Sequence, residues 1–338
     1  MASVASGPDL LRLIAIPVLG WAAWRDHRIR RVSPRLWWPL VGLGAALLVW
    51  EGSVALSHPG PAWRLFLLRS VISLGGLGLL AVGFYRYGLI GAADAKAIAT
   101  LAVLFPTYPA YTLGGVLLPL VRPPLGVFSL TVLTNTALLG LLYPAWLAIR
   151  NVRERELSVP IFFARRVHWS ELPTVHGRLA ETPDGWALGG LDLDALRMYL
   201  RWRKASLIDL RSRPGELRDP KSLPADLGEP TDGRPDPTAA ISPEDVSDVS
   251  EPVPGCGSDE SDATAADPWG AEAFLSSVDS AYGATPQQLR AGLEFLSRAD
   301  RVWITPGLPY LVPVFLGLLV AFGYGDLLYG GFRAAGLV

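Results

Sequence analysis

The chain has one cysteine, Cys256, in 338 residues, which excludes an internal disulfide and a cysteine-based zinc site. Charged residues are also scarce. They make up 18% of the sequence, against about a quarter in an ordinary soluble domain. Half of the residues are hydrophobic, and they gather in runs too long and too poor in charge for the core helices of a soluble protein. The sequence therefore predicts an all-α polytopic membrane protein.

Six apolar runs approach the length of about 20 residues that a helix needs to cross a bilayer. They cover 9–24, 37–56, 65–85, 96–121, 126–149 and 308–330. We interpret the first run as a membrane helix rather than a secretory signal, because it ends in Trp24-Arg25-Asp26 and lacks a small-residue cleavage site. The prediction is a fold with about six transmembrane helices.

Several residues inside these runs predict local features. Prolines are expected to kink or break the fourth run; they are Pro106, Pro109 and Pro119. Glycines in the third run are expected to allow close helix contact; they are Gly75, Gly76, Gly78 and Gly83. Arg12 and Arg69 are expected to extend their side chains to the nearer membrane interface.

The basic residues predict the orientation of the chain. They gather in the loops after 9–24, before 96–121 and after 126–149, which fall on one side if the runs alternate across the membrane. The positive-inside rule makes this side cytoplasmic. We therefore expect a multi-pass protein of the cell membrane with its N-terminus outside.

A polar insert, 151–305, separates a membrane core of five helices, 1–150, from the sixth helix within 306–338. We expect it to be a small cytoplasmic α+β domain. Strand-like residues cover 161–169, and helices are expected after the capping residue Asp192 and at Thr285-Pro286. Residues 211–268 are rich in Pro, Asp, Ser and Gly and poor in large apolar side chains, so we expect them to be disordered.

Acidic side chains are rare in the membrane core because burying their charge is costly. The core and the sixth helix contain Asp9, Asp26, Glu51, Asp94 and Asp326. Only Asp26, at the end of the first run, and Asp94, before the fourth, are expected at the same depth on the cytoplasmic side. Two close carboxylates share a proton, which suits hydrolysis of an amide by an activated water.

Each of these two aspartates also has a simpler explanation when it is taken alone. Asp26 lies in an arginine-rich loop, where it could pair with a cation at the interface. Asp94 precedes an apolar helix, where the helix dipole favours an acid. The spacing of the residues leaves these alternatives open.

Two stretches resemble the type IV prepilin peptidase family of Gly-x-Gly-Asp aspartic peptidases, and most of all its archaeal preflagellin/prepilin branch. One is Trp21-Ala-Ala-Trp24-Arg25-Asp26 with the basic loop that follows, and the other is Gly91-Ala92-Ala93-Asp94-Ala95-Lys96. The resemblance implies that Asp26 and Asp94 are the catalytic pair and that Gly91 shapes the approach to Asp94. Ala93 stands where the motif has its second glycine.

The resemblance implies a membrane endopeptidase that removes the short basic leader of pilin or archaellin precursors at the cytoplasmic face. It implies no metal and no cofactor, and the single cysteine predicts neither the four-cysteine cluster nor the methyltransferase activity of bacterial members. The expected partners are these precursors and the lipid bilayer, and no nucleic acid. The alternatives are a transporter or proton-conducting protein that uses paired carboxylates, and a membrane anchor that presents the insert as a binding module.

Overall fold

The computed structural model describes residues 4–29, 32–57, 60–87, 90–155, 160–187, 189–236, 267–307 and 309–338. The described chain is mostly helical and divides into two compact units. Unit 1 comprises Met1–Tyr143 and Leu308–Val338, and unit 2 comprises Pro144–Gly307. The expected loop position of Cys256 lies outside the described residues.

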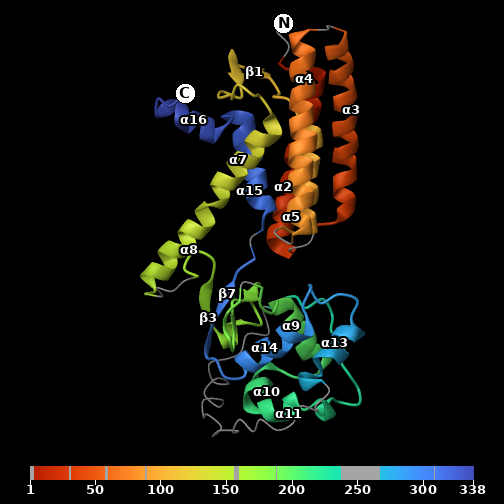
Figure 1. Ribbon diagram of the computed structural model, residues 1–338, viewed down its shortest axis with the longest axis vertical. Coiled ribbons are helices and arrows are strands. Elements are labelled where there is room, and N and C mark those ends of the chain that lie inside the picture. The colour runs from red at the N-terminus through yellow and green to blue at the C-terminus, as the bar shows by residue number, and fades with distance from the viewer. Residues whose placement is uncertain are drawn as a thin grey trace. The chain divides into compact units, whose positions relative to one another are not determined.

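Unit 1 is built from helices, most of which are labelled in Figure 1. They are α1 (Gly7–Arg12), α2 (Ala15–Ile29), η1 (Pro34–Leu36), α3 (Trp37–Leu56), α4 (Pro61–Val71), the π-helical η2 (Ile72–Leu77), α5 (Gly78–Arg86), α6 (Ala92–Leu104), α7 (Phe128–Gly140), α15 (Leu311–Gly323) and α16 (Leu327–Ala334). Helix α8 (Leu142–Arg153) continues from α7 into unit 2. A short hairpin, β1 (Tyr111–Leu113) with β2 (Val116–Leu118), follows α6.

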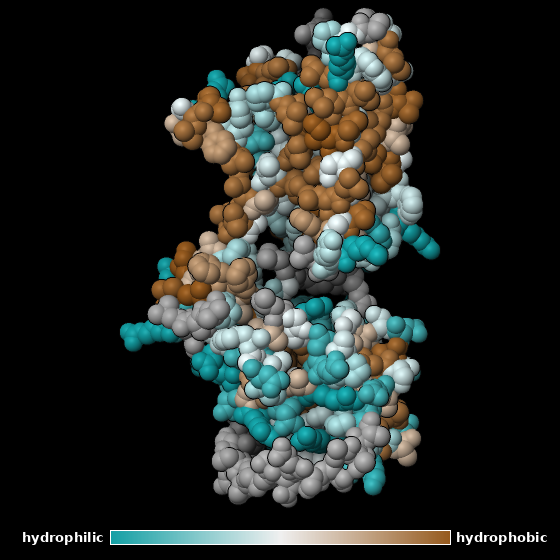
Figure 2. Space-filling view, in the orientation of Figure 1, coloured by the Kyte–Doolittle hydropathy of each residue, from teal (hydrophilic) through white to brown (hydrophobic). Residues whose placement is uncertain are grey.

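Three helical stretches of the described chain are long and apolar enough to cross a membrane. They are Pro34–Leu56, Pro61–Arg86 and Phe128–Arg153, and Leu311–Gly323 is a shorter apolar helix. Large apolar side chains point outward from these stretches, and Figure 2 shows a largely brown surface over the helices of unit 1. A face of this kind is stable in lipid rather than in water, so the chain has the character of a membrane protein.

Three of the six expected runs are not single helices. The run 308–330 is divided between α15 and α16, and two other runs are interrupted in ways that their residues explain. The run 96–121 stops being helical after Leu104, because Pro106 disfavours the helical conformation at Phe105 and supplies no N–H. The run 9–24 is split between α1 and α2. The predicted break of the fourth run at its prolines is therefore confirmed, and the expectation of one continuous helix over 9–24 was wrong.

Arg12 explains the position of α1. Its side chain is 1% exposed and does not reach for the interface as expected. The guanidinium bonds the carboxylates of Asp9 at 2.9 Å and Glu51 at 2.7 Å, and its Nε donates to the carbonyl of Leu104 at 3.1 Å. Because a buried cation needs partners of this kind, Arg12 ties α1 to α3 and to the end of α6.

The helices of unit 1 pack closely at glycines other than those expected. A Cβ on Gly44 of α3 would lie 3.0 Å from the backbone nitrogen of Leu104 in α6, and one on Gly317 of α15 would lie 2.8 Å from the nitrogen of Thr136 in α7. By contrast, a Cβ on any of the four glycines of the third run would meet nothing within 4 Å. Their expected role in close packing was therefore wrong.

Unit 2 contains a three-stranded antiparallel sheet in its described part, in which β7 (Arg301–Thr305) lies between β3 (Arg165–His168) and β4 (Arg178–Leu179). The other elements are η3 (Trp169–Glu171), β5 (Glu181–Thr182), β6 (Gly185–Trp186), α9 (Leu193–Trp202), α10 (Leu207–Ser212), α11 (Pro214–Arg218), η4 (Pro220–Ser222), η6 (Pro268–Gly270), α13 (Ala271–Ser277) and α14 (Pro286–Leu296). Leucines of α9 and α14 form much of a shared core.

Two helix starts in unit 2 confirm predictions made from the sequence. The side chain of Asp192 accepts a hydrogen bond from Asp194 N at the start of α9, and Thr285 forms a capping box at the start of α14. The apolar stripe of α14 is buried, as a packing face should be. Of the expected strand 161–169, only Arg165–His168 is a strand.

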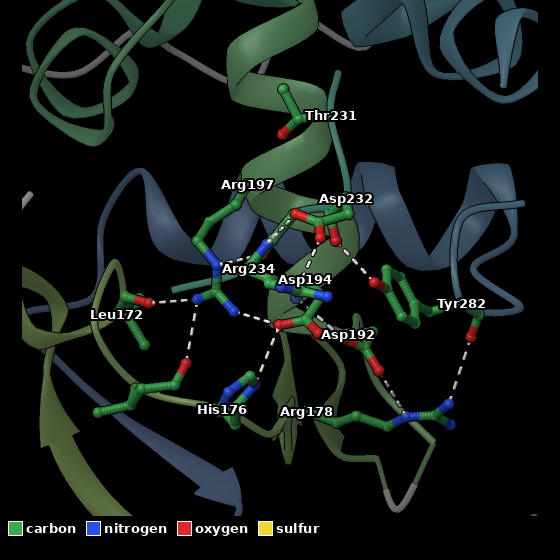
Figure 3. A network of polar contacts seen from close by, with 12 residues as sticks. Leu172, His176, Arg178, Asp192, Asp194, Arg197, Thr231, Asp232, Arg234 and Tyr282 are labelled. Carbon is green, nitrogen blue, oxygen red and sulfur yellow. Dashed lines mark hydrogen bonds and ion pairs between the residues drawn. The ribbon is translucent and has the colours of Figure 1, made fainter. Parts of the chain in front are cut away.

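Residues 211–236 are folded, contrary to the expected disorder, and Figure 3 shows one reason. The buried guanidinium of Arg197 donates to the carbonyl of Gly233 at 2.7 Å and to that of Leu172 at 2.7 Å, and it pairs with Asp194. These contacts fix a segment that has little apolar surface of its own. The rest of the expected disordered stretch, 237–266, lies outside the described residues.

Candidate functional site

Asp26 lies in the penultimate turn of α2 and faces the start of another helix. Its Oδ2 accepts a hydrogen bond from the backbone N–H of Leu311, the first residue of α15, at 3.3 Å. The N-terminus of a helix carries a partial positive charge, so this position favours an ionised carboxylate. Asp26 is therefore well placed to act as a base.

Asp94 lies in the first turn of α6. Its Oδ2 accepts a hydrogen bond from the backbone N–H of Gly91 at 3.2 Å, which caps the helix. Burial raises the pKa of Asp94 to about 6 against the lowering effect of this hydrogen bond, and the charge of Asp26 raises it further. Of the two carboxyl groups, Asp94 is thus the one whose surroundings favour the protonated form.

Small residues lie one turn from each of the two aspartates and are buried in the same cluster. Ala22 and Ala23, one turn before Asp26, and Ala97, one turn after Asp94, belong to one buried cluster together with Leu311. Alanine side chains allow helices to approach closely. The site is therefore assembled from the end of α2 and the starts of α6 and α15, which lie far apart in the sequence.

Gly91 and Ala93, the other two motif positions, differ in what they require. A Cβ on Gly91 would lie 3.3 Å from Asp94 Oδ2, so the absence of a side chain leaves room for the carboxylate. Ala93 lies within the first turn of α6, where alanine is the best helix former. The replacement of the motif's second glycine by Ala93 is thus compatible with the local structure.

Tyr310 is a residue of this region that sequence reasoning missed. It precedes Leu311 and packs against two buried clusters, one that contains Ala97 and one that contains Ile98. The charge of Asp94 acts on its hydroxyl group. The sequence gave little reason to predict a role for Tyr310, because a tyrosine at the start of an apolar helix is usually an interfacial anchor.

An apolar groove of about 590 Å³ runs beside α2 on the segment that leads to Asp26. Its walls come from α2, η1 and α3; they are Ile14, Val18, Trp21, Ser33, Arg35, Leu36, Pro39, Leu40 and Leu43. Trp21 is five residues before Asp26 on the same helix, so the groove lies on a different face of α2 from that carboxylate. A groove of this composition suits an apolar segment rather than a polar ligand.

The other acidic residues of unit 1 have structural partners. Asp9 and Glu51 surround Arg12, and Asp326 caps α16 while its Oδ2 accepts a hydrogen bond from Thr131 at 2.7 Å. Across the part of the chain that the structure describes, no group of three or more His, Cys, Asp or Glu side chains could hold a metal ion.

Residues 13–145 match the sequence model of the type IV leader peptidase family. The matched stretch contains both Asp26 and Asp94, and it supports the resemblance that the two motifs indicated. The match implies that the chain is a peptidase. No curated protein matches the chain.

Proposed function

Starting from the match of residues 13–145 to the type IV leader peptidase family, we propose that the chain is an aspartic endopeptidase that cleaves the leader from pilin-like or archaellin precursors. The observation that carries this proposal is that Asp26, at the end of α2, lies near enough to Asp94 for its charge to act on that carboxyl group, while each accepts a hydrogen bond from a backbone N–H.

The environments of the two groups divide the roles between them. Asp26, at the positive end of α15, is the ionised base that removes a proton from the attacking water. Asp94, whose pKa burial raises to about 6, keeps the shared proton and hydrogen-bonds the scissile carbonyl oxygen. It then passes this proton to the leaving amine as the tetrahedral intermediate breaks down, and Asp26 retains the proton taken from water.

We assign the apolar helix of the substrate to the groove beside α2. An apolar helix that follows the cleavage point would lie against Ile14, Val18 and Trp21, on the helix that carries Asp26. The basic leader would extend to the side on which the arginine-rich loop after α2 lies. By the positive-inside rule this side is cytoplasmic, and the N-terminus of the chain lies outside.

A transporter or proton-conducting protein is less well supported by the buried polar groups of unit 1. Such a path needs polar groups that relay ions or protons from one to the next. The buried hydroxyls of Ser73 and Thr136 instead donate to backbone carbonyls. The hydroxyls of Tyr108 and Thr131 form a short chain that ends at Asp326, which caps α16. These groups satisfy the ends and bends of helices.

The test is cleavage of a tagged precursor by the full-length chain in proteoliposomes, followed by gel mobility and mass spectrometry of the new N-terminus. We expect Asp26→Asn and Asp94→Asn each to lower the cleavage rate by at least about a hundredfold. Asp326→Asn is the matched control, because Asp326 caps a helix away from the pair, and it should cleave normally once folded. Wild-type cleavage rates in either Asp26→Asn or Asp94→Asn would remove that residue from the mechanism.

A further inference from the structure

The segment that follows α8 is held firmly to the last turn of that helix. Asn151 is fully buried, and its amide nitrogen donates to the carbonyls of Ile161 and Ala164, both at 2.8 Å. The backbone N–H groups of Phe163 and Ala164 both bond the carbonyl of Pro160. Phe162 and Phe163 therefore project from a rigid turn beside the end of α8.

This turn is apolar on its outer side although it lies in the polar unit. Phe162 is 52% exposed and Phe163 is 63% exposed, and their rings contact each other edge to face. On α8 a second exposed apolar set repeats every third residue: Trp146, Ile149 and Val152. Exposed aromatic and aliphatic side chains gathered in this way mark an interaction surface.

Basic residues surround the apolar turn. Arg153 and Arg155 lie exposed in the last described residues before it, and Arg166 lies exposed on β3, two residues after Ala164. A surface that combines aromatic side chains with a rim of arginines matches the composition of proteins that bind the headgroup region of anionic membranes. The chemistry favours lipid over an acidic protein because the apolar part is central.

The position of the turn in the chain indicates the same partner. Helix residues Phe128–Arg153 are long and apolar enough to cross a membrane, so Arg153 marks the point where the chain leaves the bilayer. In the sheet of unit 2, Arg165 pairs with Ile304 and Arg178 with Thr305. Both connections to the apolar helices, before β3 and after β7, therefore leave from the same end of this sheet.

We propose that this end of unit 2 docks on the membrane, with Phe162 and Phe163 inserted among anionic lipid headgroups and Arg153 and Arg155 beside the phosphates. The Asn151 clamp makes the docking rigid, because it fixes the inserted turn to the helix that enters the bilayer. This function of unit 2 is independent of the proposed peptidase chemistry.

Nitroxide labels at single cysteines of the full-length chain test the proposal. Cys256→Ser removes the single native thiol, and Phe163→Cys or Phe162→Cys then places a label on the turn. Leu227→Cys is the matched control, because Leu227 is 42% exposed and Gly228 next to it bonds Trp202 at the C-terminal end of α9. The opposite end of α9 contacts Gly177, at the end of the sheet that carries the turn.

The protein is placed in vesicles of phosphatidylcholine with phosphatidylglycerol, and collisions of each label with oxygen and with a water-soluble nickel chelate are measured. We expect the ratio of oxygen to nickel collisions to be about tenfold higher at residue 163 than at residue 227, because apolar oxygen concentrates in the bilayer and the polar chelate is excluded from it. Arg153→Gln with Arg155→Gln should lower this ratio in phosphatidylglycerol vesicles and leave it unchanged in phosphatidylcholine alone.

Two results would overturn the proposal. Equal nickel access at residues 163 and 227 would show that the turn lies in water. Protection of residue 163 from both oxygen and nickel would show that protein, rather than lipid, covers it. Cleavage activity is not part of the readout, so failure of the docking proposal and failure of the peptidase proposal remain distinguishable.

Discussion

Acidic side chains lie near both ends of α6, and the groups that bond their carboxylates differ between the two ends. At the C-terminal end, Arg12 bonds Leu104 O and holds Asp9 and Glu51 in a closed ion-pair cluster with Thr107. At the N-terminal end, Asp94 and Asp26 accept backbone hydrogen bonds from Gly91 and Leu311. At one end a guanidinium holds the carboxylates, and at the other end backbone N–H groups donate to them.

The difference shows how one helix supports both stability and chemistry. An arginine that pairs with a carboxylate keeps it ionised and fixed, which suits a structural role. A carboxyl group held by one backbone N–H and partly removed from water has a pKa that can approach the operating pH. The predictions below test this contrast.

The largest expected effect is on stability, through the ion-pair cluster around Arg12. Arg12→Leu leaves Asp9 and Glu51 without their cation, and we expect it to lower the free energy of unfolding by about 3–5 kcal/mol. Arg69→Leu is the matched control, because Arg69 donates to the carbonyl of Leu125 rather than to an acid, and it should cost about 1 kcal/mol. Thermal unfolding in detergent measures both. Equal losses would contradict the structural role of the cluster.

The protonation of Asp94, at the N-terminal end of α6, should determine the pH dependence of cleavage. Because the pKa of Asp94 is raised to about 6, its proton is present below that pH and is lost as the pH rises through it. We therefore expect kcat/KM to fall about tenfold for each pH unit above about 6, since this parameter reports the free enzyme. A rate that stays flat between about pH 5 and 8 would contradict the role of Asp94 as the proton carrier.

The same raised pKa affects stability, with the sign given by linkage. Folding favours protonated Asp94, so the free energy of unfolding should decrease as the pH rises from about 4 to 6. Asp94→Asn removes the charge and should flatten this part of the profile. A profile unchanged by Asp94→Asn, measured by thermal unfolding across this range, would assign the dependence to other groups.

Tyr310→Phe is expected to have a smaller effect. Loss of a hydroxyl that lies within the field of Asp94 should lower kcat by up to about tenfold and move the alkaline limb of the pH profile, while KM changes little. Tyr85→Phe, on an exposed part of α5, serves as the control. A change in KM alone would make Tyr310 a packing residue.

The smallest effect is expected at the two small motif residues. Gly91→Ala places a Cβ 3.3 Å from Asp94 Oδ2, so the carboxyl group must shift by a few tenths of an ångström and cleavage should slow several-fold. Ala93→Gly should leave cleavage unchanged and lower stability by about 0.5–1 kcal/mol, because glycine is the poorer helix former. Equal activity in the two variants would remove the special role of Gly91.

The sequence predicted features that depend on local composition. Capping residues located the starts of α9 and α14, and the prolines after Leu104 located the break after α6. It did not reveal that residues 211–236 fold, because their order depends on the buried Arg197 that bonds Gly233 from 36 positions away. The sequence also predicted that the Arg12 side chain extends to the membrane interface, because its partner carboxylate on Glu51 is 39 positions away.

The sequence alone determined the class of the protein and the two acids of its proposed chemistry, because apolar runs and motifs are read from neighbouring residues. Only the tertiary structure decided which groups surround those acids. The N–H of Leu311 lies 285 positions from Asp26, and contacts over such distances follow from how helices pack rather than from local propensity. Tyr310, the groove beside α2 and the clamp of Asn151 on the phenylalanine turn became visible for the same reason.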